Sequence, residues 1–161
     1  MKKSETVVWC IVLVLLGCFM HMAHEMSFYQ PWMGYVFPAN ECAWEHMKMV
    51  FYPLLLLAIV AGLRQRNPGA FSALVWTGVV AIPVQLILFY VYWPFTRHSI
   101  LIVDIIAYVV MLTAAVVLGN RWRDQLLFRR SWKWAAVAAV LVCGLMTWLT
   151  ACPGKNFLFW E

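Results

Sequence analysis

The sequence predicts an all-helical bundle of five membrane-spanning helices. Of its 161 residues, 65% are hydrophobic and only 12% are charged, whereas a soluble domain carries about a quarter charged residues. Several apolar runs approach the roughly 20 residues that a helix needs to cross a bilayer. Each run is expected to be helical, because a segment surrounded by lipid must satisfy its own backbone hydrogen bonds. We therefore predict one multi-pass domain, residues 1–161, in the cell membrane.

The first predicted span covers about residues 6–24. It opens with "MKKSETVVWCIVLVLLGC", whose basic start and apolar core are also typical of a secretory signal peptide. Apolar residues continue past Cys18 and no small-residue cleavage pattern follows, so we expect the segment to be retained. The connection after it, residues 26–40, is rich in aromatic side chains. Such a segment is typical of an interfacial belt, with a lid over the helix ends as the alternative.

The other four spans are placed at about residues 43–63, 70–92, 99–119 and 134–151. The turn "RQRNPG" supplies helix-breaking residues between the second and third spans, and "YWPFTRH" separates the third from the fourth. Pro53 in the second span and Pro83 in the third can each kink a helix. The fifth span is the shortest.

The basic residues predict the orientation of the bundle. One side of the predicted membrane holds Lys2, Lys3, Arg64, Arg66, Arg121, Arg123, Arg129, Arg130 and Lys133, and the other only Lys48, Arg97 and Lys155. The positive-inside rule then puts the N-terminus in the cytoplasm and the C-terminus outside. This topology accounts for the basic isoelectric point and gives no reason to expect nucleic acid. Membrane lipids are the expected partners, and the oligomeric state stays open.

Ionisable residues gather on the outer side of the predicted bundle. They are His21, His24, Glu25, Glu41, Glu45, His46, His98 and Asp104. The carboxylates among them outnumber the basic side chains nearby, Lys48 and Arg97. Burying a charge at membrane depth costs a few kcal/mol or more. Shared protons, histidinium or a bound divalent metal ion would offset the excess negative charge.

These residues give the candidate site. We predict that "HMAHE" and "NECAWEHMK" form facing walls of an outer pocket, reached also by the fourth span. The candidate acid–base residues are His21, Glu25, Glu45 and Asp104, with Lys48 as their electrostatic partner. A divalent metal ion would be held by His21, Glu25, His46 and Asp104, although the spacing is not that of the metalloprotease motif.

Simpler interpretations stay open for several members of the pocket. Glu41 in the first turn of the second helix, capped by Asn40, would complement the helix dipole. Lys48 would form either a local ion pair with Glu45 or an interhelical pair with Asp104. On the same side, a disulfide between Cys42 and Cys152 would tie the fifth helix to the second. The sequence contains no C-x-x-C motif, which argues against thiol redox chemistry.

Two resemblances accompany these motifs. "NECAWEHMKMVFYP", with the upstream "HMAHE", is similar to an uncharacterised family of small bacterial multi-pass membrane proteins with an Asn-Glu-x-x-Trp-Glu-His-x-Lys pattern, which implies no activity. "CFMHMAHE" resembles the His-x-x-x-Glu helix of the sterol-isomerase (emopamil-binding) family, a five-helix membrane fold. That resemblance implies a proton-transfer pocket lined by His21 and Glu25, with Glu41 or Glu45 as third group. The family's later Asn and Trp have no counterpart, and Asp104 stands instead.

Two classes of function follow from the pocket. One is a small membrane enzyme with acid–base or metal chemistry on a lipid-like or amphipathic substrate. The other is a protein that binds or transports protons or a cation, and an accessory membrane subunit is a third possibility. A transporter needs polar groups that continue across the membrane. The spans offer few of these below the cluster, which favours a pocket open to one side.

Overall fold

The computed structural model describes residues 2–98 and 100–152, which form helices joined by short connections. Five long helices run through this part of the chain: α1 (Lys3–Met26), α2 (Ala43–Gln65), α3 (Pro68–Thr96), α4 (Leu101–Trp122) and α6 (Trp132–Ala151). Each is long and apolar enough to cross a membrane. The predicted all-helical fold is confirmed, with five helices that could span a membrane, while the placement of the N-terminus in the cytoplasm and of the C-terminus outside stays a prediction.

Two short elements lie in the connections and were not predicted. A 3₁₀ turn, η1 (Met33–Tyr35), is part of the connection between α1 and α2, and α5 (Leu126–Arg130) joins α4 to α6. The helices extend past several predicted limits, most of all α3, which includes Pro83 and Pro94 and ends only at Thr96. Proline is tolerated inside membrane helices because neighbouring groups satisfy the freed carbonyls.

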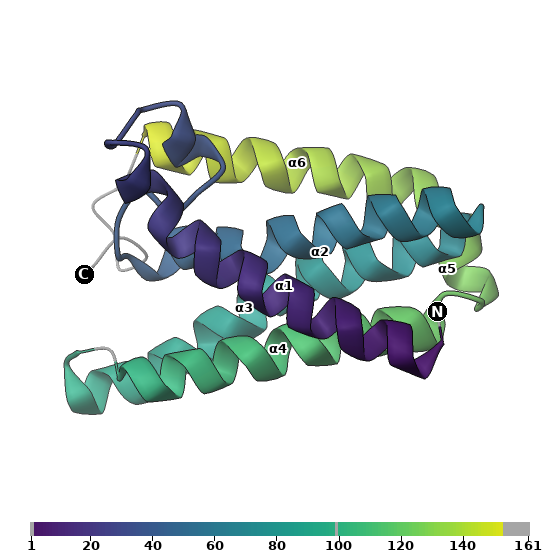
Figure 1. The fold of residues 1–161 in the computed structure, drawn as a ribbon, viewed down its shortest axis with the longest axis horizontal. Coiled ribbons are helices and arrows are strands. Elements are labelled where there is room, and N and C mark those ends of the chain that lie inside the picture. The colour runs from purple at the N-terminus through teal and green to yellow at the C-terminus, as the bar shows by residue number, and fades with distance from the viewer. Residues whose placement is uncertain (1, 99, 153–161) are drawn as a thin grey trace.

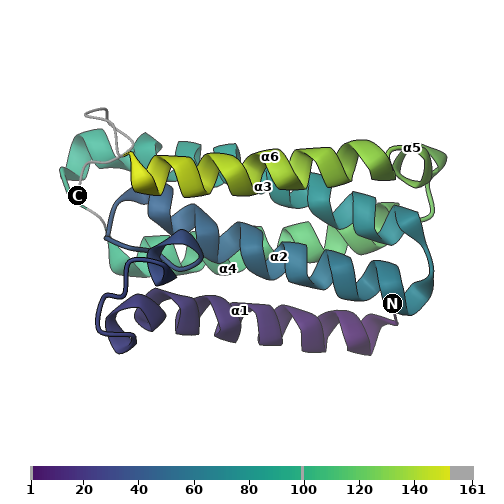
Figure 2. The same ribbon diagram turned by 90° about the horizontal axis from the view of Figure 1, so that it is seen from above.

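The long helices alternate in direction and lie side by side (Figures 1 and 2). Helix α3 packs against α2, α4 and α6, while α1 covers α2 and α4. Helix α2 is the most buried of the five. In contrast, α1, α4 and α6 expose many large apolar side chains, such as Ile11, Ile105 and Val140. Soluble monomers rarely expose so much apolar surface, so this surface is typical of a multi-pass membrane protein.

One close helix contact fixes α1 against α4. Tyr108 of α4 is buried, and its hydroxyl donates to the Leu13 carbonyl of α1 at 3.3 Å. Gly17 makes room for the ring, because a Cβ at this position would lie only 1.8 Å from the Tyr108 hydroxyl oxygen. Small residues permit this kind of approach between membrane helices.

The two ends of the bundle differ. The loop end is formed by residues 27–42 together with the last turn of α6, on the left of Figure 1. The N-terminal end is formed by the start of α1, the turn between α2 and α3, and α5. That turn has the expected breaker chemistry, since the Asn67 side chain caps α3 by accepting from the Gly69 backbone N–H at 2.9 Å. The candidate site residues belong to the loop end.

Candidate functional site

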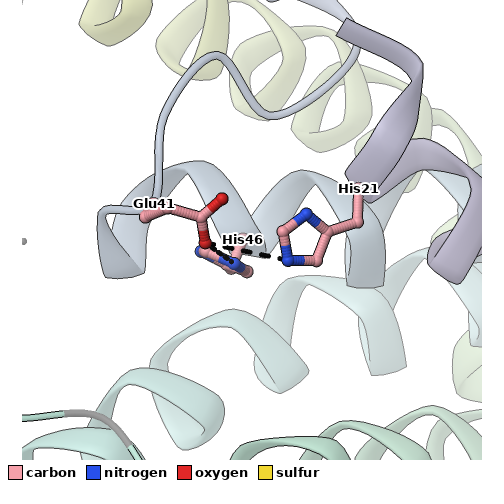
Figure 3. Close-up of side chains that lie close together, drawn as sticks. All are labelled: His21, Glu41 and His46. Carbon is pink, nitrogen blue, oxygen red and sulfur yellow. Dashed lines mark ion pairs between the residues drawn. The ribbon is translucent and has the colours of Figure 1, made fainter. Parts of the chain in front are cut away.

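Two histidines and a glutamate meet at the loop end. His21 Nε2 lies 3.7 Å from Glu41 Oε2, and His46 Nε2 lies 3.5 Å from the same oxygen. Figure 3 shows both imidazole rings turned toward the Glu41 carboxylate. The rings meet edge to face, with centroids 5.1 Å apart. One ligand atom from each residue lies within 4.8 Å of the other two, which is the spacing of a group that can hold a metal ion.

Three segments place these side chains. His21 lies in α1, little more than one turn before the helix ends at Met26. Glu41 lies in the bend before α2, where the Asn40 side chain accepts from the Cys42 backbone N–H at 3.1 Å and forms an Asx turn. His46 lies in the first turn of α2. Helix α2 begins only at Ala43, with Cys42 as its N-cap, so the expectations that Asn40 caps it and that Glu41 lies in its first turn were wrong.

The hydrogen bonding of His46 determines which of its nitrogens faces the cluster. Nδ1 lies 3.0 Å from the Cys42 carbonyl oxygen. A carbonyl can only accept, so Nδ1 carries the proton in this bond. In the neutral imidazole Nε2 then presents a lone pair toward the Glu41 carboxylate. A histidine that donates its second N–H to a backbone carbonyl is the usual arrangement of a metal ligand.

The cluster needs a positive charge between its members. A lone pair and a carboxylate oxygen that face each other repel unless a proton or a metal ion lies between them. Two imidazoles and one carboxylate match the preferences of zinc and of non-haem iron. Ligand atoms about 2.1 Å from a tetrahedral zinc are about 3.4 Å from one another, which is close to the 3.5 and 3.7 Å observed here. Two of the three distances therefore match a divalent ion, and all three ligand atoms lie within 4.8 Å of one another.

The cluster is open to its surroundings. The side chains of His21 and Glu41 are 40% and 69% exposed, and that of His46 is 30% exposed. Structural zinc sites are closed by four protein ligands, whereas catalytic sites keep a position for water or substrate. Three protein ligands at a partly exposed position resemble the catalytic arrangement.

A second group of polar side chains, which includes Lys48 and Glu45, is buried at the same end of the bundle. Lys48 is completely buried, and its ammonium contacts Glu45 Oε2 at 2.6 Å, the Gly34 carbonyl at 2.5 Å and the Thr150 hydroxyl at 2.6 Å. The Thr150 hydroxyl donates in turn to Glu45 Oε1 at 2.7 Å, and the Ala39 backbone N–H reaches Glu45 Oε2 at 2.8 Å. All three ammonium donors thus have acceptors. The network joins α2 to α6 and to the connection over the loop end.

This network settles the pairing of Lys48. The local ion pair with Glu45 is present, and the interhelical pair with Asp104 is not. Asp104 is half-buried at the start of α4 and accepts a short hydrogen bond from Tyr92 of α3. Lys48 and Glu45 neutralise each other, so the Glu41 carboxylate is left with the two histidines.

The other ionisable residues of the predicted outer side lie elsewhere. Glu25 is exposed near the end of α1, and His98 is exposed after α3. His24 stacks edge to face on Tyr29. Within the described residues, the ligand atoms that converge belong to His21, Glu41 and His46, so Glu25 and Asp104 are not in that group. In this group Glu41 supplies the carboxylate that was predicted to come from Glu25 or Asp104.

The disulfide between Cys42 and Cys152, which the sequence left open, is absent from the structure. None of the five cysteines, all of which lie in the described part of the chain, forms a disulfide bond. Cys42 is fully buried ahead of α2, whereas Cys152 is exposed after the last turn of α6. The loop end is instead held to α6 by the hydrogen bonds of Thr150.

Residues 2–157 match a family described as "Family of unknown function (DUF6512)". The chain belongs to this family. The match and the five apolar helices agree with the expectation of an uncharacterised multi-pass membrane family. No curated protein and no solved structure matches the chain. The resemblance to the sterol-isomerase family therefore stays a prediction from the sequence, and the family assignment implies no reaction.

Two members of the site were not predicted from the sequence in their observed roles. Glu41 was interpreted either as a residue that complements the helix dipole, with Asn40 as the cap, or as a possible third group of the pocket implied by the sterol-isomerase resemblance, and was not named as a metal ligand. Thr150 was not considered, since a threonine near the end of an apolar helix gives little signal. The pattern Asn-Glu-Cys offered one clue to Glu41, because Asn at the head of such a pattern favours an Asx turn that holds the next residue outside the helix.

Proposed function

We propose that this protein binds a divalent transition-metal ion at the loop end, through His21, Glu41 and His46. The observation that carries the proposal is the convergence of two imidazole nitrogens on one carboxylate oxygen, with the proton of His46 Nδ1 directed to a backbone carbonyl. This arrangement leaves a lone pair facing a carboxylate, and a metal ion satisfies both. The positive-inside rule puts this end outside the cytoplasm.

The open side of the centre suggests what the ion does. Three protein ligands leave a position for water or for an oxygen of the substrate. The site lies level with the ends of α1 and α2, where the polar headgroups of a bilayer would be. We therefore propose metal-assisted acid–base chemistry on a lipid-like or amphipathic substrate, with the ion polarising an oxygen or activating a water molecule.

Transport across the membrane is less well supported. The interior of α2 beyond Lys48 is occupied by apolar residues, among them Phe51, Leu54 and Leu57, which are almost completely buried. An ion path through a bundle is marked by polar or ionisable side chains facing its interior. A site that is reached from one side fits this interior better.

Zinc binding by the purified full-length protein tests the proposal. In detergent, Zn²⁺ competes with a chromophoric chelator, and the wild-type chain should bind one ion. Each of H21A, E41Q and H46A should weaken binding by more than about 100-fold, since even the loss of an outer-shell partner costs about 10–100-fold. Matched controls are H98A and E25Q, which change exposed residues of the same types near the same end.

The controls also separate the structure from the sequence-based prediction. E25Q and D104N should leave zinc affinity within about twofold, although both residues were expected to be ligands. If the wild-type protein binds no zinc, or if the three cluster variants bind it as well as the controls do, the cluster is a histidinium–carboxylate pair and the proposal fails.

A further inference from the structure

A cleft at the N-terminal end carries a second possible site. Its lining residues come from the start of α1, the end of α2 and the residue after α4, and these helix ends lie on the right of Figure 1, opposite the loop end. Its volume is about 380 Å³, within the range of small-molecule sites in proteins. It is lined by charged side chains near the helix ends and by apolar side chains, the apolar floor, further along the helices.

The charged part of the cleft is basic. Lys2, Arg64 and Arg123 line it together with a single acidic residue, Glu5. Glu5 accepts from the Lys2 backbone N–H at 2.9 Å and lies 3.4 Å from Arg64 Nη2, so it holds Arg64 across the opening. The three basic side chains together carry more charge than this one carboxylate, so the lining of the cleft is net positive. An anion entering the cleft would therefore be attracted rather than repelled.

The arginines keep donors for such an anion. Arg123 donates to Gln65 Oε1 at 2.8 Å and to Asp124 Oδ2 at 3.2 Å. Asp124 is outside the cleft, and its carboxylate also accepts from Asn67 at 2.9 Å. A guanidinium has five N–H donors in a planar fork that matches a phosphate. The hydrogen bonds that Arg123 and Arg64 make to Gln65, Asp124 and Glu5 use only some of these donors.

The apolar floor points to the kind of anion. Trp9, Leu57, Val60 and Ala61 lie below the charged residues. Arg64 is close to the last residue of α2 and Lys2 precedes the first residue of α1. The cleft thus lies at the level of the lipid headgroups, with its apolar part toward the hydrocarbon. Tryptophan is enriched at this interface.

We propose that this cleft binds the phosphate group of an anionic phospholipid. Arg64 and Arg123 donate to the phosphate, Lys2 adds positive charge, and the apolar floor contacts the first part of the lipid below the headgroup. Basic pockets between membrane helices bind lipid headgroups elsewhere by the same combination of charge and apolar contact. The site is independent of the proposed metal centre at the other end.

Native mass spectrometry of the full chain tests this assignment. The protein is released from mixed micelles holding equal amounts of phosphatidylglycerol and phosphatidylcholine, and the ratio of the two bound lipids is measured. The wild-type chain should retain phosphatidylglycerol in preference. R64Q and R123Q should each lower the ratio about fivefold, because a positive charge that lines the cleft and contacts the anionic headgroup contributes about 1 kcal/mol. E5Q should raise it, because it removes the opposing carboxylate.

Two further variants keep the test specific. R130Q removes the same charge from the same end, from an exposed residue that does not line the cleft, and should leave the ratio within about twofold. V60W fills the cleft without changing its charge and should lower the ratio. If R130Q lowers the ratio as much as R64Q does, or if V60W has no effect, general attraction to a basic surface explains the preference and the cleft is not the site.

A competition arm identifies the source of the phosphate. Inorganic phosphate in large excess should leave the bound phosphatidylglycerol in place, because it lacks contacts with the apolar floor. Complete displacement by inorganic phosphate would show that the cleft recognises a free anion, and the lipid assignment would be wrong.

Discussion

Replacing Lys48 by methionine should destabilise the protein strongly. The ammonium of Lys48 is completely buried and is within 2.6 Å of Glu45, of Thr150 and of the Gly34 carbonyl. Methionine fills a similar volume but donates no hydrogen bond. K48M therefore leaves the Glu45 carboxylate, which is 1% exposed, without its positive partner.

The size of the effect follows from this burial. Removing one partner of a buried ion pair costs about 3–5 kcal/mol, because the other charge is left uncompensated. In a protein of this length, each kcal/mol shifts the melting temperature by about 2–4 °C. We therefore expect K48M to melt roughly 6–20 °C below the wild-type protein.

Thermal unfolding in detergent, followed by tryptophan fluorescence, measures the shift. The variants are K48M, E45Q and the double variant K48M/E45Q, with K3M as the matched control because Lys3 is exposed at the start of α1. The double variant should lose less stability than the sum of the two single losses, since it leaves no buried charge unpaired.

Two results would refute this reasoning. If K48M melts no lower than K3M, water reaches the ammonium and the network does not bear on stability. If the losses of the two single variants simply add up in the double variant, Lys48 and Glu45 do not interact in the folded protein, and the contacts described above are wrong.

Three other predictions concern packing, redox state and pH. G17A should cost about 1–3 kcal/mol through overpacking against Tyr108, whereas G144A, where a Cβ meets nothing within 4 Å, should leave the melting temperature unchanged or raise it; equal shifts would contradict the α1–α4 contact. Cys42 and Cys152 should both react with a thiol reagent after denaturation without reductant, and a band shift between reduced and oxidised gels would reveal the disulfide that the structure lacks. Zinc affinity at the loop end should fall from about pH 8 to about pH 5, because ligand imidazoles must be neutral, and pH-independent affinity would argue against histidine ligands.

The helices could be predicted because their cause is local. Each span is an apolar run that must form its own backbone hydrogen bonds in lipid, and the turn at Asn67 carries its own breaker chemistry. The short elements η1 and α5 could not be found in this way, since neither has an apolar run of its own. The start of α2 at Ala43 agrees with the predicted second span, but the expected cap at Asn40 was wrong, because Asn40 makes a turn and Cys42 is the N-cap.

The site was predicted only in part because its contacts are not local. His21 and His46 were identified from their side chains and their expected level in the membrane. Thr150 of α6 hydrogen-bonds to both Lys48 and Glu45, although it is about a hundred residues away in the chain. The periodicity of the sequence gives no sign of this contact. Asp104 was expected at the site only because of its predicted depth in the membrane. Depth does not determine which neighbouring helix a side chain faces, and the Asp104 carboxylate contacts Tyr92 on α3.

X-ray absorption at the zinc edge of the zinc-loaded protein tests the metal centre most directly. The proposed centre predicts a first shell of two imidazole nitrogens at about 2.0–2.1 Å and one carboxylate oxygen at about 2.0–2.2 Å, completed by water. The multiple-scattering signature of imidazole should weaken in H21A and in H46A and persist in H98A. A spectrum with oxygen ligands alone, or one with the same imidazole signature in all four proteins, would contradict a metal site built from His21, Glu41 and His46.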